Sequence, residues 1–116
     1  MDWLKEEDPQ NRYHRQVILE GWGEDAQQAL ADAKVVVAGA GGLGSPAALY
    51  LAAAGVGNLI LWDYDDVSLS NLNRQILYST DDLGHEKSAT GASHLNRLNP
   101  EITVSGVSID ISEETL

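Results

Sequence analysis

A run of β-branched residues that leads directly into a glycine-rich turn constrains the fold of this chain more than any other feature. Residues 34–38 read KVVVA, and the turn at residues 39–44 reads GAGGLG. The apolar run predicts a strand buried on both faces, as strands are in parallel sheets covered by helices. Residues 45–54 favour a helix, and residues 58–62 favour a second buried strand. The order strand, glycine turn, helix, strand predicts one βαβ unit.

Helical and strand patterns also lie on either side of this unit. Residues 9–20 and 24–33 are expected to form helices before it. Residues 86–98 are expected to form a helix after it, followed by a third strand at 102–109. The residues expected to face inward are Tyr13, Val17 and Leu19 in the first helix, Ala26, Ala29, Leu30 and Ala33 in the second, and Ala89, Ala92, Leu95 and Leu98 in the third.

Three further local signals accompany these elements. Ser45 is expected to cap its helix, with Pro46 at the first helical position. The polar stretch 64–82 contains turn formers and a short helix around residues 71–78, and a loop of this length in a compact domain is usually functional. Residues 110–116 read as the start of another helix.

These patterns predict an α/β fold. We expect a Rossmann-like βαβαβ half of a doubly wound parallel sheet, preceded by two N-terminal helices. Residues 1–33 would form a helical arm, and residues 34–116 a partial nucleotide-binding domain whose sheet is truncated at the C-terminus. The chain is therefore expected to be a fragment or a shortened product. Truncation would leave residues 35–38 with an open apolar edge, which is expected to self-associate or to be poorly protected.

Charge and composition narrow the class of function. Eighteen Asp and Glu against seven Lys and Arg give a formal net charge of −11 over 116 residues. This field repels phosphate and argues against non-specific binding to nucleic acid or to anionic membranes. The acidic N-terminus does not resemble a signal peptide, and the chain contains no cysteine, which excludes disulfides and thiolate metal sites within it. We expect a cytoplasmic protein that binds any phosphate by a local site.

The glycine turn has the spacing of a nucleotide-binding site. Gly39, Gly41 and Gly44 satisfy G-x-G-x-x-G between a strand and a helix, which permits a tight turn, a close ligand approach and close helix packing. The alternative is a merely glycine-rich turn. Asp63 follows the second strand, where a carboxylate can accept hydrogen bonds from a ribose, or can simply cap a turn. A glycine turn followed by such a carboxylate can bind either a dinucleotide or ATP. These residues therefore do not distinguish the two classes of ligand.

The segment after Asp63 favours a triphosphate. Residues 67–75 read VSLSNLNRQ, and Lys87 begins the next predicted helix. A hydride-transfer cofactor needs neither Arg74 nor Lys87, whereas a triphosphate would use the guanidinium fork of one and the point charge of the other. A solvated Arg74 remains the alternative.

The sequence resembles a known family. It is similar to the ThiF/MoeB/HesA adenylyltransferases, bacterial relatives of the ubiquitin-activating enzymes, and is closest to the branches that act in molybdopterin or thiamine biosynthesis. The matching blocks, in the family's order and spacing, are RYHRQ at 12–16, GAGGLG at 39–44, GVG at 55–57, DYD at 63–65, SNLNRQ at 70–75, GHEK at 84–87 and NP at 99–100.

The resemblance implies a reaction and a set of site residues. ATP would adenylate the C-terminal Gly-Gly carboxylate of a ubiquitin-like sulfur-carrier protein and release pyrophosphate. Arg15 would reach the other subunit's site as an arginine finger, so a homodimer is implied. Lys87 would neutralise the phosphates, and Asp63 would hold the ribose. The nucleotide and its phosphates would be lined by Gly39, Gly41, Gly42, Gly44, Ser70, Asn71, Leu72, Asn73 and Arg74, with Gln75 beside them; Arg15, Arg74 and Lys87 would be catalytic.

Parts of the family pattern are absent from this sequence. The aspartate that binds Mg²⁺ and the CxxC pairs that bind Zn²⁺ lie beyond residue 116 in the family, and the three histidines lack metal-ligand spacing, so we expect no metal site here. Two alternatives stay open: a nicotinamide-dependent oxidoreductase half, and a module that binds nucleotide or carrier without turnover. For Arg15, the alternative is an exposed charge paired with Glu20 or Asp25.

Overall fold

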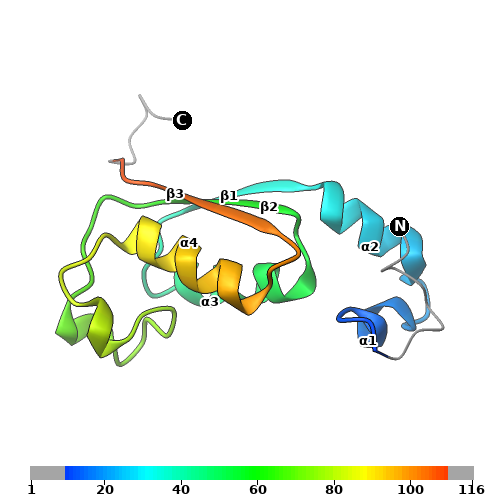
Figure 1. Cartoon of the computed structure of the whole chain (residues 1–116), viewed down its shortest axis with the longest axis horizontal. Coiled ribbons are helices and arrows are strands. Elements are labelled where there is room, and N and C mark those ends of the chain that lie inside the picture. Colours follow the sequence, from blue (N-terminus) through cyan, green and yellow to red (C-terminus); the bar gives the residue numbers. More distant parts are fainter. Residues whose placement is uncertain (1–9, 110–116) are drawn as a thin grey trace.

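The computed structural model describes residues 10–109, in which two helices are followed by alternating strands and helices (Figure 1). The elements are α1 (His14–Val17), α2 (Gly23–Asp32), β1 (Lys34–Ala38), α3 (Gly44–Ala54), β2 (Asn58–Trp62), the short 3₁₀ turns η2 (Leu69–Asn71) and η3 (Thr80–Asp82), α4 (Lys87–Leu98) and β3 (Thr103–Val107).

The three strands form a parallel sheet in the order β1-β2-β3, which confirms the predicted α/β fold. Val37 is in register with Leu61, and Leu61 with Gly106. Both crossover helices, α3 and α4, lie on the same face of the sheet (Figure 1). The carboxyl ends of the strands therefore meet at one end of the molecule, where ligands bind in open α/β sheets.

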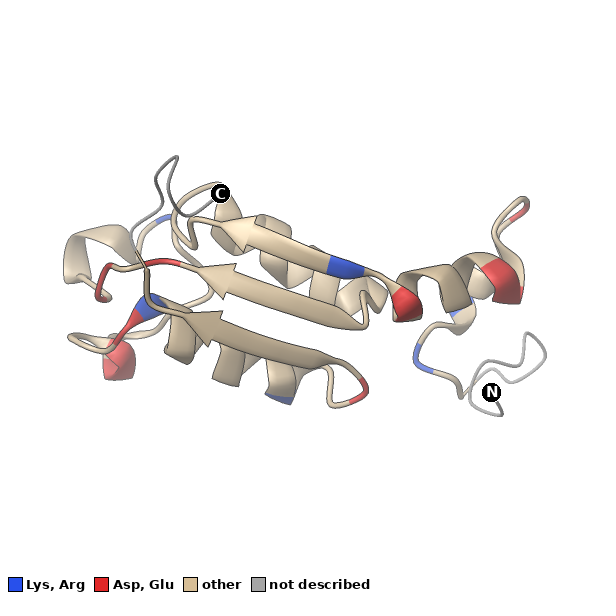
Figure 2. Cartoon of the chain, turned by 90° about the horizontal axis from the view of Figure 1, so that it is seen from above, with Lys and Arg blue, Asp and Glu red and all other residues tan. Residues whose placement is uncertain are grey.

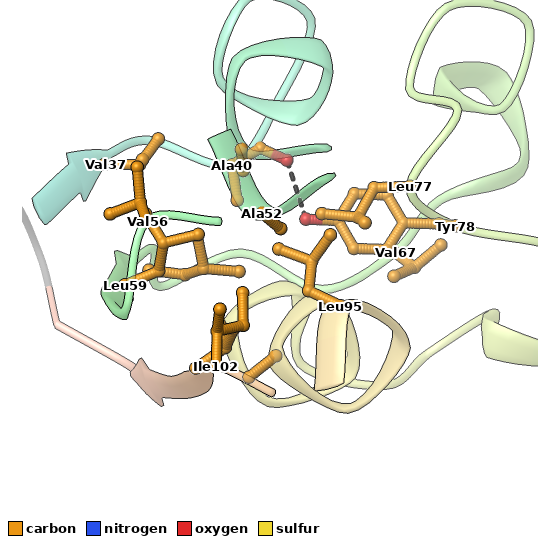
Figure 3. Packing of buried hydrophobic residues seen from close by; sticks show 14 residues of the cluster. Val37, Ala40, Ala52, Val56, Leu59, Val67, Leu77, Tyr78, Leu95 and Ile102 are labelled. Atoms are coloured by element: carbon orange, nitrogen blue, oxygen red, sulfur yellow. Dashed lines mark hydrogen bonds between the residues drawn. The ribbon is translucent and has the colours of Figure 1, made fainter. Parts of the chain in front are cut away.

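The core lies between the sheet and these two helices (Figure 3). Leu59 and Leu61 of the central strand are buried members of this core, and Leu95 of α4 belongs to it as well. Figure 3 shows Leu59 and Leu95 within it. Alternate β2 residues are buried because successive side chains of a strand point to opposite faces. Removing such a side chain, as in Leu95→Ala, typically costs about 2–5 kcal/mol.

The opposite face of the sheet corrects the prediction that β1 is buried on both faces. Val37 is buried, but Val36 is 42% exposed, and Lys34 and Ala38 are also exposed. The reason is topological, because both helices cover one face and no helix of residues 10–109 covers the other. Within these residues β1 pairs only with β2, so the expected open edge is confirmed.

Several inward-facing predictions were wrong in detail. In the arm, Leu19 is 60% exposed, while Tyr13 and Val17 are buried as predicted. In α4, Ala92 and Leu95 are buried, but the positions predicted beside them are not. The residues predicted to face inward that are exposed are Leu19, Ala29, Ala89 and Leu98.

The helix boundaries also differ from the prediction. Among residues 10–20 only His14–Val17 is α-helical. Ser45 is not a cap, because α3 begins at Gly44 and the Ser45 hydroxyl instead accepts a hydrogen bond from the Leu77 amide. No α-helix forms at residues 71–78, where turns follow η2. The helix start predicted at residues 110–116 lies outside the described residues.

A buried polar network joins the N-terminal arm to the helices. The Gln27 amide donates to the carbonyl of Ala54 at 2.8 Å, and Gln16 donates to the same carbonyl at 3.0 Å. Asn99 donates to the Tyr13 hydroxyl at 2.7 Å and to the carbonyl of Ala52 at 2.8 Å. The arm is therefore fixed at the C-terminal end of α3. Across residues 10–109, no helix has the length and apolar character needed to cross a bilayer.

Candidate functional site

The glycine turn has the backbone geometry that its sequence predicts. Gly39 has a φ of +92°, a backbone conformation that residues with a side chain rarely adopt. Its amide donates a hydrogen bond to the carbonyl of Trp62 at 2.7 Å. A Cβ at Gly44 would collide with the carbonyl oxygen of Gly39, so the third glycine allows the helix to start directly against the turn. A Cβ at Gly42 would meet open space. Gly42 is thus not needed for packing, which leaves it free to face a ligand.

Asp63 fastens the end of β2 to this turn. One carboxylate oxygen accepts a hydrogen bond from the Ala40 amide at 2.7 Å, and the other accepts one from the Asp65 amide at 2.8 Å. Asp63 thus performs the capping role considered as the alternative. Each carboxylate oxygen has a second lone pair, so this role leaves acceptor capacity for a ribose hydroxyl.

The loop after β2 docks back onto the glycine turn. The Tyr78 hydroxyl donates to the carbonyl of Ala40 at 2.7 Å (Figure 3). The Leu77 amide donates to the Ser45 hydroxyl at 2.9 Å. Sequence analysis assigned no role to Tyr78 and predicted Ser45 only as a helix cap, because a single tyrosine or serine has no periodicity that marks a long-range partner. An aromatic residue within a polar loop was the signal that could have indicated Tyr78.

Burial raises the pKa of Tyr78, and the negative charges of Asp63 and Asp82 raise it further. The phenol therefore stays protonated and remains a hydrogen-bond donor to Ala40 at neutral pH. This bond holds the loop in place independently of any ligand.

Gln75 lies against the middle of the glycine turn. A Cβ at Gly41 would be 3.5 Å from the Gln75 side-chain nitrogen. The side chain is buried, and its oxygen has no hydrogen-bond partner among the described residues. An unsatisfied buried oxygen is costly, which makes this position suited to a donor from outside the chain.

Lys87 is buried beside the strand ends. It is 5% exposed, and its backbone amide donates to the carbonyl of Asp65 at 3.0 Å. No carboxylate of residues 10–109 lies within ion-pair distance of its ammonium group. Lysine is rarely buried without a counter-charge, because desolvating an ion is unfavourable. The position therefore favours an anionic ligand.

The segment 70–74 lies at the surface of the same loop. Ser70, Asn73 and Arg74 are exposed, and Asn71 and Leu72 are half-buried. The Arg74 guanidinium donates to the Ser70 carbonyl at 3.1 Å and to the Asn73 side chain at 3.0 Å. It is therefore turned toward its own loop rather than toward the glycine turn.

Three cavities lie away from these residues. They have volumes of about 410, 450 and 350 Å³, and none of the three is lined by the glycine turn, Arg74 or Lys87. The candidate site lies at the strand ends and consists of the turn, Asp63, Gln75 and Lys87.

The second half of the loop is tied to α4. The Asp82 carboxylate accepts hydrogen bonds from the Ser79 amide at 2.7 Å and lies 2.9 Å from the His94 ring. Burial alone would raise the pKa of Asp82, but the bonds from Ser79 and His94 outweigh it and lower the pKa. This connection fixes the loop just before Lys87.

Arg15 lies far from these residues in its own chain. Its helix, α1, is at the opposite end of the molecule from the carboxyl ends of the strands (Figures 1 and 2). Arg15 is exposed, and it forms no ion pair with Glu20 or Asp25. It cannot contribute to the site of the same copy. Within residues 10–109, no cluster of three His, Asp or Glu could hold a metal ion.

Comparison with known proteins places this chain in a family. The model of the ThiF family matches residues 13–116. The chain is 50% identical to the sulfur carrier protein ThiS adenylyltransferase of Escherichia coli over 105 residues, which are 90% of this chain and 42% of that protein. It is 48% identical to the molybdopterin-synthase adenylyltransferase of the same organism, with the same coverage. It thus spans less than half the length of these curated relatives.

A solved structure supports the same family assignment. Escherichia coli MccB, crystallised with AMPCPP and MccA, superposes with a TM-score of 0.84 at 37% identity, covering 93% of this chain and 34% of that one. With a family model that covers most of its length and relatives near half identity, this chain belongs to the ThiF family.

Proposed function

We propose that this chain is the ATP-binding part of an enzyme that adenylates the C-terminal Gly-Gly carboxylate of a ubiquitin-like sulfur-carrier protein. A carboxylate oxygen of the carrier bonds to the α-phosphorus of ATP, and the bond from that phosphorus to the pyrophosphate oxygen breaks. Negative charge develops on the departing pyrophosphate. Fixed cations and backbone amides near that charge lower the barrier.

The observation that carries the proposal is Lys87, a residue that is 5% exposed and whose ammonium group has no carboxylate of residues 10–109 within ion-pair distance. In a chain of net charge −11, a phosphate needs a local site that overrides the overall field. Lys87 supplies a point charge beside the glycine turn, whose helix presents free amides to an anion. Asp63 accepts from the ribose, and the Gln75 oxygen, unpartnered among the described residues, accepts from the nucleotide.

The remaining residues complete the nucleotide surface. Gly39, Gly41, Gly42 and Gly44 let the phosphates approach the backbone. Residues 70–74 line the nucleotide, and Arg74 exchanges its bonds to Ser70 and Asn73 for the phosphates. The family resemblance assigns the ligands of Mg²⁺ and of Zn²⁺ to positions outside this chain, and the proposal adopts that assignment.

The proposal includes a homodimer in which Arg15 of one copy serves the site of the other. Its support is the position of α1, at the opposite end of the molecule from the strand ends. The arm, residues 1–33, is thus a unit that acts on the second copy, while residues 34–116 hold the nucleotide. The reaction is placed in the cytoplasm, where ATP is supplied.

Calorimetry with ATP and NAD tests the proposal. ATP should bind, NAD should not, and Arg74→Ala should weaken ATP binding. Preferential binding of NAD would favour the oxidoreductase alternative and overturn the proposal. Because the chain spans only part of its relatives, we expect weak ATP binding and little or no adenylation by the chain alone. Robust carrier-dependent ATP–pyrophosphate exchange by this chain would contradict that expectation.

A further inference from the structure

The His94 ring, near the middle of α4, contacts a charged side chain through each of its nitrogen atoms. Its Nε2 atom lies 2.9 Å from a carboxylate oxygen of Asp82, and its Nδ1 atom lies 2.7 Å from the Arg97 guanidinium. A guanidinium has only donors, so Nδ1 accepts the bond from Arg97 and the ring proton is assigned to Nε2. His94 therefore donates a hydrogen bond to Asp82.

Asp82 carries this connection into the segment 83–86, which we call the lead-in segment because it ends at Lys87. The Asp82 carboxylate also accepts bonds from the amide and the hydroxyl of Ser79, at 2.7 and 3.1 Å. Burial alone would raise its pKa, but the bonds from Ser79 and His94 lower it, so the carboxylate is ionised at neutral pH. Among residues 10–109, His94 is the one side chain beyond this loop that bonds to it.

The lead-in segment is also attached to the strand ends by its backbone. The Val67 amide donates to the carbonyl of His85 at 2.9 Å. The Lys87 amide donates to the carbonyl of Asp65 at 3.0 Å. Lys87 therefore follows a segment with two attachments, one to the loop after β2 and one, through Asp82, to α4.

The attachment through Asp82 returns to the helix that Lys87 begins. His94 is seven residues after Lys87, so the two lie about two turns, or roughly 10 Å, apart along α4 and on the same side of it. The bond between Asp82 and His94 thus draws the loop along the first two turns of the helix. A cavity of about 450 Å³ lies at this contact, and its lining includes Asp82, His85, Glu86, His94 and Arg97.

We propose that His94 is a positioning residue for the nucleotide site: its bond to Asp82 holds the lead-in segment against α4 and thereby fixes Lys87 beside the glycine turn. His94 acts on the nucleotide only through Lys87. This inference rests on the proposed function for the role of Lys87, whereas the contact between His94 and Asp82 requires no nucleotide.

Hydrogen exchange measures the contact without a ligand. His94→Leu should speed exchange of the Lys87 and Val67 amides by roughly tenfold or more, as expected when a hydrogen bond to a charged group is lost. The amides of β2 should keep their rates. His94→Gln retains an N–H donor and should restore slow exchange, and His85→Leu, which removes an exposed imidazole from the same cavity, is the matched control. Unchanged exchange in His94→Leu, or no rescue by Gln, would overturn the proposal.

ATP affinity tests whether the contact acts through Lys87. His94→Leu should weaken ATP binding, and His94→Gln and His85→Leu should bind ATP as the unchanged chain does. In a Lys87→Met chain, which lacks the ammonium group, His94→Leu should cause no further loss. A general structural role would instead weaken ATP binding by the same factor in both chains, and that result would contradict the proposal.

The two measurements separate this inference from the proposed function. Exchange that follows the predicted pattern in a chain without affinity for ATP would support the hold of His94 on the lead-in segment and refute the nucleotide site. ATP binding that His94→Leu leaves unchanged would support the nucleotide site and refute the positioning role of His94.

Discussion

The carboxylate of Asp63 accepts a hydrogen bond from the backbone amide of Ala40 at 2.7 Å. This contact joins the end of β2 to the turn that follows β1. Since the other oxygen of Asp63 accepts from Asp65, and Asp65 accepts from the Lys87 amide, one chain of hydrogen bonds runs from the glycine turn to Lys87. The position of the proposed phosphate-binding cation is thereby linked to the position of the turn.

Asp63→Asn should weaken this connection. An amide keeps one acceptor oxygen, but its NH₂ group faces one of the two backbone donors. The expected loss is about 1–3 kcal/mol in the free energy of unfolding, measured by urea denaturation. Asp66→Asn is the control, because Asp66 is an exposed carboxylate in the same loop. Equal losses for the two variants would contradict the structural role of Asp63.

The glycines of the turn should separate folding from ligand binding. Gly44→Ala should destabilise the fold strongly, since its Cβ would collide with Gly39. Gly42→Ala should leave the melting temperature unchanged, because its Cβ would meet open space, yet weaken ATP binding by crowding the phosphates. Thermal unfolding and calorimetry of both variants give the comparison. A stable Gly44→Ala protein would refute the packing argument.

The raised pKa of Tyr78 predicts that the folded protein loses stability in alkali. Its pKa is raised in the folded chain, so its contribution to stability is complete below the unfolded value of about 10 and is lost as the pH rises above it. Unfolding monitored between pH 9 and pH 12 should therefore show a loss of stability that Tyr78→Phe reduces. Phe at this position should also cost about 1 kcal/mol at pH 7, because the carbonyl of Ala40 loses its donor. An unchanged alkaline profile in the variant would argue against this assignment.

The open edge of β1 predicts an alternating pattern of amide exchange. The Gly39 amide bonds to β2, so the amides of Val35 and Val37 point the same way, and those of Val36 and Ala38 point outward. Hydrogen exchange should be slow at 35 and 37 and fast at 36 and 38. Uniformly slow exchange in a strictly monomeric chain would contradict an uncovered edge.

Local patterns predicted much of this fold. The β-branched run, the glycine turn and the apolar spacing of the helices placed all three strands and both crossover helices, because these signals depend on neighbouring residues. Burial of both faces of β1 was predicted wrongly, since exposure of Val36 depends on where the helices pack. Leu19 and Ala89 were misplaced for a similar reason: periodicity indicates an apolar side, but tertiary packing decides which residues it covers.

The site residues were indicated in different ways. The place of Asp63 after the second strand and the charge of Lys87 indicated these two residues, and the family resemblance indicated Gln75. The structure brings all three to the strand ends, and their roles in binding stay predictions. The sequence did not indicate that Tyr78 and Ser45 hold the loop, because the hydrogen-bond partners of these two residues lie more than thirty positions away. Arg74 was expected near phosphate, and its present contacts are within its own loop.

The most direct test of the account is the ATP affinity of Lys87→Met compared with Lys34→Met. Both variants remove one positive charge, but Lys34 is exposed at the amino end of β1, away from the site. The account predicts that Lys87→Met weakens ATP binding by roughly tenfold to a hundredfold, as expected for a lost charge-assisted bond, while Lys34→Met has little effect. Equal affinities for the two variants would contradict it.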